Sequence, residues 1–176
     1  MKLVMSDKKI KFYLNDKKVE AEENETIWQV ANRLGTEIPH LCYANKPGYR
    51  ADGNCRACMV EIEGERVLAA SCIRKPTNDM KVKTSSEKAK KSRELVFELL
   101  LSDQPEREVA HDNNSHFWNW VDKVDVKENR FPKKTPCEPD SSHPSMAVNL
   151  DACIQCNLCV RACREVQVND VIGMAY

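Results

Sequence analysis

Three common features are missing from this 176-residue sequence: a net charge, a long apolar run and a secretory leader. The 27 lysines and arginines balance the 27 aspartates and glutamates, so charge gives no reason to expect nucleic acid or an anionic membrane as a partner. No apolar run approaches the length of a membrane span. Residues 1–9 lack the apolar stretch of a signal peptide. These absences predict a cytoplasmic protein with no membrane span.

Cysteine is absent from residues 73–136 but abundant on both sides of this gap, which favours two modules and a connector. Eight of the nine cysteines form two sets, spaced C-x12-C-x2-C-x13-C and C-x2-C-x2-C-x3-C. Disulfides are disfavoured, because C-x2-C thiols cross-link poorly and nine cysteines leave one over. Thiolates held for metal suit a reducing, cytoplasmic compartment better. The first set is Cys42, Cys55, Cys58 and Cys72, and the second is Cys153, Cys156, Cys159 and Cys163.

The spacing of the first set is typical of a plant-type 2Fe–2S cluster, which needs four thiolates around a flat two-iron core. Gly48 and Gly53 allow the lead-in loop conformations that are barred to other residues. A structural zinc site remains an alternative, although zinc sites usually pair two tight C-x2-C knuckles and this set has one. A Rieske centre is excluded, because His40 precedes Cys42 and no C-x2-H exists. His40 is predicted to be an ordinary loop residue.

The second set has the spacing of bacterial 4Fe–4S ferredoxins, in which the first three cysteines bind one cubane and the fourth ligates another. The complementary motif would lie beyond Tyr176, so we expect a longer protein with two such clusters. If the chain ends there, Cys137 or Cys163 completes a single cubane; otherwise Cys137 is a spare thiol. Arg164 stands where proline is usual, which leaves the metal prediction intact.

Turn and periodicity signals predict the elements around the first set. Asn15 and Asp16 separate two strands, a capping box at Thr26 and Gln29 opens an apolar helical stripe, and Gly35 ends it. A hairpin, a helix, a loop and further strands are the parts of a β-grasp, the fold of plant-type ferredoxins. The predicted strands span residues 9–14, 18–21, 59–62 and 67–70, the helix spans 26–35, and the loop spans 36–54.

The connector is predicted to hold two helices, at residues 85–101 and 115–124, followed by a proline-rich linker at 130–145. The basic start of the first helix is interpreted as a solvated face, and the aromatic residues of the second as packing. The domains expected in this α+β chain are residues 1–84 (2Fe–2S), 85–142 (connector and linker) and 143–176 (the first part of a 4Fe–4S domain). The basic residues are Lys88, Lys90, Lys91 and Arg93, and the aromatic ones are Phe117, Trp118 and Trp120.

Residues 38–42, 53–64 and 69–72 resemble the N-terminal 2Fe–2S module of three protein families. These are NAD-dependent formate dehydrogenase alpha subunits, iron hydrogenases, and the large iron–sulfur subunit of NADH-quinone oxidoreductase. Residues 147–156 and 163–173 are similar specifically to the formate dehydrogenase branch. Many members carry a further cubane in H-x3-C-x2-C-x5-C order, but residues 106–117 hold His111 and His116 and no cysteine, so that cluster is not expected here.

The resemblance implies an electron relay. It would run between a downstream molybdopterin domain of the same polypeptide, holding molybdenum or tungsten, and a flavin- and NAD-binding partner subunit. Residues 1–176 contain no glycine-rich phosphate loop, so the segment is expected to carry no substrate site of its own. Two alternatives remain: the corresponding segment of a hydrogenase or NADH-quinone oxidoreductase subunit, and, in another class, a zinc-stabilised interaction module.

Overall fold

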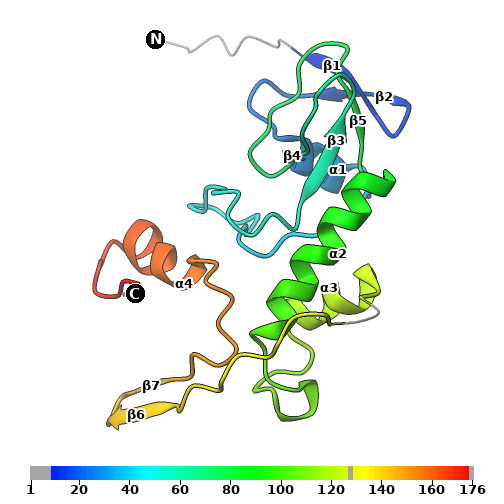
Figure 1. Cartoon of the computed structure of the whole chain (residues 1–176). Coiled ribbons are helices and arrows are strands. Elements are labelled where there is room, and N and C mark those ends of the chain that lie inside the picture. The colour runs from blue at the N-terminus through cyan, green and yellow to red at the C-terminus, as the bar shows by residue number, and fades with distance from the viewer. Residues whose placement is uncertain (1–8, 127–128, 175–176) are drawn as a thin grey trace, which may run out of the picture.

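The computed structural model describes residues 9–126 and 129–174, so residues 1–8, expected to lack a leader, lie outside the described residues. The N-terminal half forms a five-stranded mixed sheet with one helix packed against it (Figure 1). The strand order is β2-β1-β5-β3-β4; β1 and β5 run parallel, and the other neighbours are antiparallel. The elements are β1 (Ile10–Leu14), β2 (Lys17–Ala21), α1 (Ile27–Arg33), β3 (Met59–Ile62), β4 (Ala69–Ala70) and β5 (Lys81–Lys83).

The predicted hairpin is confirmed. Leu14 pairs with Lys17, and the two residues between them, Asn15 and Asp16, have φ of 49° and 65°. Positive φ at both central positions gives a two-residue turn the twist that matches its flanking strands. Phe12 and Leu14 lie two residues apart on β1, so their side chains are directed to the same face of the sheet, where both are buried.

The predicted capping box at the start of α1 is also confirmed. The Gln29 amide donates to the Thr26 hydroxyl at 3.3 Å, and the Thr26 amide donates to the Gln29 side-chain oxygen at 2.9 Å. Gly35 follows the helix with φ of +74°, the conformation that ends helices. The apolar face of α1 packs on the sheet in one core, whose fully buried members include Phe12, Ile27, Val30, Ala31, Val60 and Val82.

Two strands differ from the prediction. The strand expected at residues 67–70 shrinks to Ala69–Ala70, and Val67 is exposed. The three-residue β5 was not predicted, yet it lies between β1 and β3 in the middle of the sheet. Its only apolar residue is Val82, which is buried, and one apolar residue among lysines has no period that marks a strand.

Both connector helices are confirmed, as α2 (Glu87–Ser102), capped by Ser86, and α3 (His116–Val124), capped by Ser115. A short 3-10 turn (Arg107–Val109) lies between them. The predicted aromatic packing is confirmed as well: the Phe97 and Phe117 rings stack with centroids 6.0 Å apart. We call this second core the connector core; its buried members are Leu41, Ala57, Phe97, Phe117, Trp118 and Trp120.

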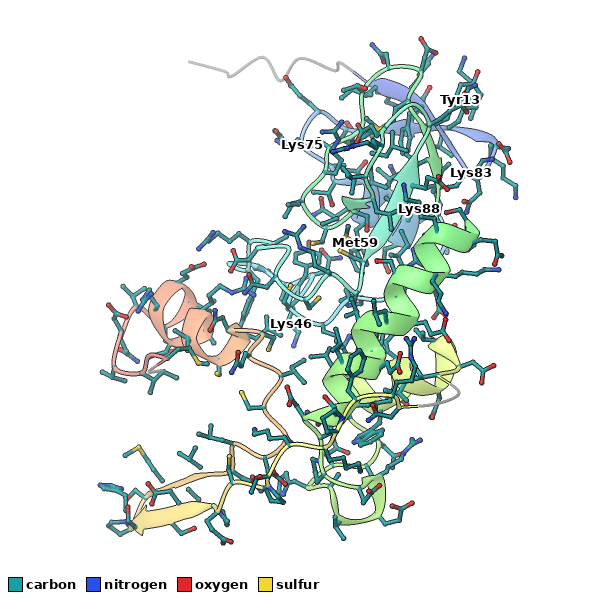
Figure 2. The ribbon with its side chains drawn as sticks, viewed as in Figure 1. Tyr13, Lys46, Met59, Lys75, Lys83 and Lys88 are labelled. Atoms are coloured by element: carbon teal, nitrogen blue, oxygen red, sulfur yellow. The ribbon has the colours of Figure 1, made fainter. Side chains whose placement is uncertain are left out.

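The interpretation of the basic start of α2 as a solvated face was wrong for one residue. Arg93 is buried and donates from Nε and Nη2 to the Met59 carbonyl, at 3.1 and 2.7 Å. Burial lowers the pKa of Arg93. Figure 2 shows Met59 at the start of β3 beside α2, with Lys88 at the start of that helix. Arg93 thus ties α2 to β3, the strand that begins directly after Cys58.

The C-terminal part contains more structure than the predicted linker. A hairpin of β6 (Asp140–His143) and β7 (Met146–Val148) projects away from the rest of the chain (Figure 1). All its residues are exposed, and the polar run of β6 has no alternating pattern to reveal a strand. The helix α4 (Leu158–Arg161) continues into a π-helical turn (Ala162–Val166). No helix in the described part of the chain has the length and apolar character to cross a membrane.

Glu98 provides a pH-dependent prediction. Its side chain is 3% exposed and accepts hydrogen bonds from the Arg130 amide at 2.8 Å and from the guanidinium at 2.7 and 2.6 Å. These contacts lower the pKa of Glu98 to about 2. We expect Glu98→Gln to lower the urea midpoint at pH 7, because the ionised pair is then lost. The ion pair's contribution is complete above the ordinary glutamate pKa of 4.5 and disappears as the pH falls toward about 2.

Urea unfolding at pH 7 and pH 3 checks this expectation. The difference in urea midpoint between wild type and Glu98→Gln should be smaller at pH 3. Glu87→Gln is the control, because the Glu87 side chain is 94% exposed. A difference between wild type and Glu98→Gln that stays constant with pH would contradict the prediction.

Candidate metal centre

The structure brings the four thiols of the first set together at one end of the sheet. Cys42 lies in the loop after α1, Cys55 and Cys58 lie in the turn before β3, and Cys72 follows β4. Three of the four are fully buried: Cys42, Cys58 and Cys72 are each 1% exposed, and Cys55 is partly exposed. The loop and strand positions predicted for these residues are therefore the ones observed.

The thiols approach one another in pairs. The Cys42 thiol donates to Cys55, and this hydrogen bond, together with burial, raises the pKa of Cys42. The same hydrogen bond, together with backbone amide donors, lowers the pKa of Cys55 to about 6. The Cys72 thiol likewise donates to Cys58, lowering the pKa of Cys58 to about 7 and raising its own. The two pairs are themselves neighbours, because Cys72 also experiences the charges of Cys42 and Cys55.

Backbone amides surround these sulfur atoms. The Cys55 amide donates to the Cys42 sulfur at 3.4 Å, and the amides of Leu41 and Ala57 donate to Cys55. The buried hydroxyl of Ser71 donates to the Cys58 carbonyl at 2.8 Å and also lowers the pKa of the Cys58 thiol. The role of Ser71 was not predicted; its only sequence signal is its place beside Cys72.

Positive φ angles shape the loop as predicted for the two glycines. Gly48 and Gly53 have φ of +84° and +66°. A Cβ at Gly53 would lie 3.0 Å from Ile73, and one at Gly48 would lie 3.3 Å from Val166. Arg56, between the two cysteines of the tight pair, also has positive φ, at 58°. The turn that directs Cys55 and Cys58 to one side thus uses the left-handed region.

His40 is more than an ordinary loop residue. Its half-buried ring packs edge-on against Trp28 and His116, with centroids 4.5 and 4.7 Å apart, and its carbonyl accepts from His116 Nε2 at 2.7 Å. Burial, and then the neighbouring His116, lower the pKa of His40. The other histidine of the connector, His111, is exposed. The connector core and this histidine pair together fill the region next to Cys42.

The second set is more open. Cys159 is exposed, and Cys153, Cys156 and Cys163 are partly exposed. Burial raises the pKa of Cys156, and the charges of Cys159, Cys153 and Cys42 add to that rise. The three cysteines with C-x2-C spacing are therefore neighbours, and the first set lies within electrostatic range of them. A cavity of about 440 Å³ is lined by both Cys55 and Cys156.

Amides also reach the second set. Gln155 and Asn157 have positive φ, 53° and 60°, in the tight turns between the cysteines. The Gln155 amide donates to the Cys153 sulfur, and the Val171 amide donates to the Cys163 sulfur, both at 3.4 Å. Cys137, the ninth cysteine, lies before β6, and its amide donates to Asp151 at 3.3 Å.

The donor chemistry of the first set fits a two-iron cluster. A 2Fe–2S cluster takes four thiolates, two on each iron, and amide donors to the sulfurs tune its potential. Among the residues that the structure describes, no three histidine, cysteine, aspartate or glutamate side chains converge on a point that one ion could occupy. The observed arrangement of the thiols in two pairs is compatible with a core of two irons.

Comparison with known proteins agrees with this chemistry. Residues 7–87 match the family model described as a 2Fe-2S iron-sulfur cluster binding domain. This part of the chain is therefore similar to 2Fe–2S cluster binding domains. The match includes β1 to β5 and all four cysteines of the first set.

Most of the chain is similar to parts of subunits of larger redox enzymes. It is 32% identical over 167 residues to the NADP-reducing hydrogenase subunit HndD of Solidesulfovibrio fructosivorans, covering 91% of this chain and 28% of that protein. It is 30% identical over 170 residues to an NADH-quinone oxidoreductase subunit of Rickettsia conorii, covering 95% of this chain and 25% of that protein. The chain thus spans about a quarter of the length of the curated relatives it matches.

A solved structure shows the same architecture. The crystal structure of an NAD+-reducing NiFe-hydrogenase in the H2-reduced state matches with a TM-score of 0.80 and 25% identity, covering 95% of this chain and 71% of that one. Over nearly its whole length the chain is therefore similar to a part of hydrogenase and NADH-quinone oxidoreductase subunits.

Proposed function

We propose that this chain holds two kinds of iron–sulfur cluster and relays single electrons between them. The first set, Cys42, Cys55, Cys58 and Cys72, would ligate the 2Fe–2S cluster of a β-grasp module at residues 1–84. Cys153, Cys156 and Cys159 would hold a 4Fe–4S cluster in a module at residues 143–176. Cys163 would ligate a second 4Fe–4S cluster, or the same one. The observation that carries the proposal is the paired approach of four thiols inside a matched 2Fe–2S domain.

The chain's own residues supply the conditions for such a relay. When bound, the clusters would accept and release one electron at a time, with no bond chemistry. The thiols of Cys55 and Cys58 already have lowered pKa values, which favours the thiolates that bind iron. Apolar side chains of the connector core pack against Cys55. Low solvent access and amide donors together would set the potential.

Iron analysis tests the proposal. We expect the anaerobically prepared protein to be coloured, with sulfur-to-iron charge-transfer absorption. It should contain about two iron atoms per chain for the first set and about six when both sets are loaded. A colourless protein that binds zinc instead would support the alternative of a zinc-stabilised interaction module and overturn the relay.

Within this proposal, we assign the segment to a formate dehydrogenase alpha subunit that contains molybdenum or tungsten. Residues 147–156 and 163–173, which resemble that branch, support the assignment. The relay would then connect a downstream molybdopterin domain of the same polypeptide with a flavin- and NAD-binding partner subunit. The second candidate is a hydrogenase or NADH-quinone oxidoreductase subunit, which the named relatives favour.

Metal content and dye reduction, measured on the full-length gene product, distinguish these candidate enzymes. A formate dehydrogenase would contain molybdenum or tungsten and reduce a viologen dye with formate. A hydrogenase would reduce the dye with dihydrogen, and an NADH-quinone oxidoreductase component would do neither. Each outcome leaves the relay itself to be judged by the iron analysis.

A further inference from the structure

One arginine of the C-terminal part is buried against the ligand loop of the 2Fe–2S domain. Arg161, at the end of α4, is 4% exposed. Its Nη1 donates to the Arg50 carbonyl at 2.6 Å, and its Nη2 donates to the Cys42 carbonyl and, at 3.5 Å, to the Cys156 carbonyl. Its Nε faces the Asp52 carboxylate at 3.2 Å. The guanidinium therefore contacts the backbone of one cysteine from each set.

Two further contacts join the same segments. Arg50 pairs with Asp52 at 2.9 Å and with Glu165 at 3.2 Å. Together with Arg161, these residues form a row of alternating positive and negative charges that links the loop to the helical segment. Gly48, on the same loop, lies so close to Val166 that an added Cβ would be 3.3 Å from its methyl group. Figure 1 shows α4 beside the loop that precedes β3 and away from the projecting β6–β7 hairpin.

Burial of a charged group is costly unless every donor is matched. A lone ion pair with Asp52 would leave most of the five guanidinium donors without acceptors. Here three backbone carbonyls accept from Nη1 and Nη2, and the Asp52 carboxylate offsets the charge beside Nε. The planar fork fixes the direction of each donor. Lysine in this position has one point of charge and cannot hold the same carbonyls at fixed angles. The geometry therefore restrains position as well as neutralising charge.

We propose that Arg161 is a positioning residue that locks the two cysteine sets at a fixed separation and so governs electron transfer between their clusters. The inference rests on the proposed function for the clusters themselves. In each transfer one cluster loses an electron and the other gains it, and no bond or proton changes. Because electron transfer slows steeply with distance, a loosened contact between the loop and α4 would slow it.

Arg161→Gln in the full chain tests the lock, with Arg164→Gln as the matched control. Arg164 lies one helical turn further along, is exposed, and pairs only locally, with Asp170 at 2.7 Å. Two measurements are made: amide hydrogen exchange of residues 43–54, and the magnetic interaction between the two reduced clusters in electron paramagnetic resonance. We expect Arg161→Gln to speed the exchange by about tenfold or more and to lose the magnetic interaction, while both cluster signals persist. Arg164→Gln should match wild type in both.

The inference is overturned if Arg161→Gln keeps both clusters, the wild-type exchange and the wild-type magnetic interaction. If Arg161→Gln fails to retain iron, Asp52→Asn and Arg161→Lys are measured instead, since each removes part of the same contacts; wild-type behaviour in both would likewise overturn it. Wild-type protein without iron would refute the proposed function instead. Faster exchange in iron-free Arg161→Gln than in iron-free wild type would still show the lock.

Discussion

Cys55→Ser is expected to abolish the 2Fe–2S signal in electron paramagnetic resonance while leaving the 4Fe–4S signal in place. The Cys55 sulfur accepts hydrogen bonds from the Cys42 thiol and from the amides of Leu41 and Ala57. It is therefore the acceptor of one thiol pair. With serine there, three thiolates remain for a core that needs four. The iron content should fall by about two atoms per chain.

Cys137→Ser is the matched control for this substitution. It exchanges the same atoms at a cysteine outside both sets, and the 2Fe–2S signal should survive. Retention of the 2Fe–2S signal in Cys55→Ser would exclude Cys55 as a ligand. Loss of both signals together would show that the two modules depend on each other to fold.

The second large effect is expected at Phe97. Its ring is completely buried in the connector core, stacks on Phe117 and joins α2 to α3. Phe97→Ala should lower the free energy of unfolding by about 3–5 kcal/mol, because the cavity adds to the lost transfer energy. Urea unfolding followed by tryptophan fluorescence measures this, since Trp118 and Trp120 belong to the same core.

Leu99→Ala is the control for Phe97→Ala, because Leu99 lies on the same helix with 45% of its surface exposed. Its cost should be far smaller, about 0.5 kcal/mol. A Phe97→Ala loss as small as that of Leu99→Ala would mean that α2 and α3 do not form a common core.

The elements that could be predicted are those whose signals are local. The capping box at Thr26 and the turn at Asn15 and Asp16 are each contained within four residues, and both are confirmed. The strand β5 could not be predicted in this way. Its place is decided by pairing with Tyr13 and Leu14, almost 70 positions earlier, rather than by its own pattern.

The cysteine sets were predictable because ligand spacing is a property of the chain itself. The buried arginines were not, because a charged side chain in a sequence is expected to face water. Arg93 and Arg161 are buried because distant segments supply carbonyl acceptors: Met59 for the first, and Arg50 and Cys42 for the second. Only the tertiary arrangement creates those acceptors.

The position of β5 also has a consequence for how the protein is made. All four cysteines of the first set precede β5 in the chain, but the sheet that supports their loops is continuous only once β5 has inserted between β1 and β3. During synthesis, the edge of β1 that pairs with β5 therefore stays unpaired until Lys83 has left the ribosome. If these thiols hold a cluster as proposed, iron delivered before that point would meet thiols on an incomplete sheet, so the cluster would be loaded after this segment has been synthesised.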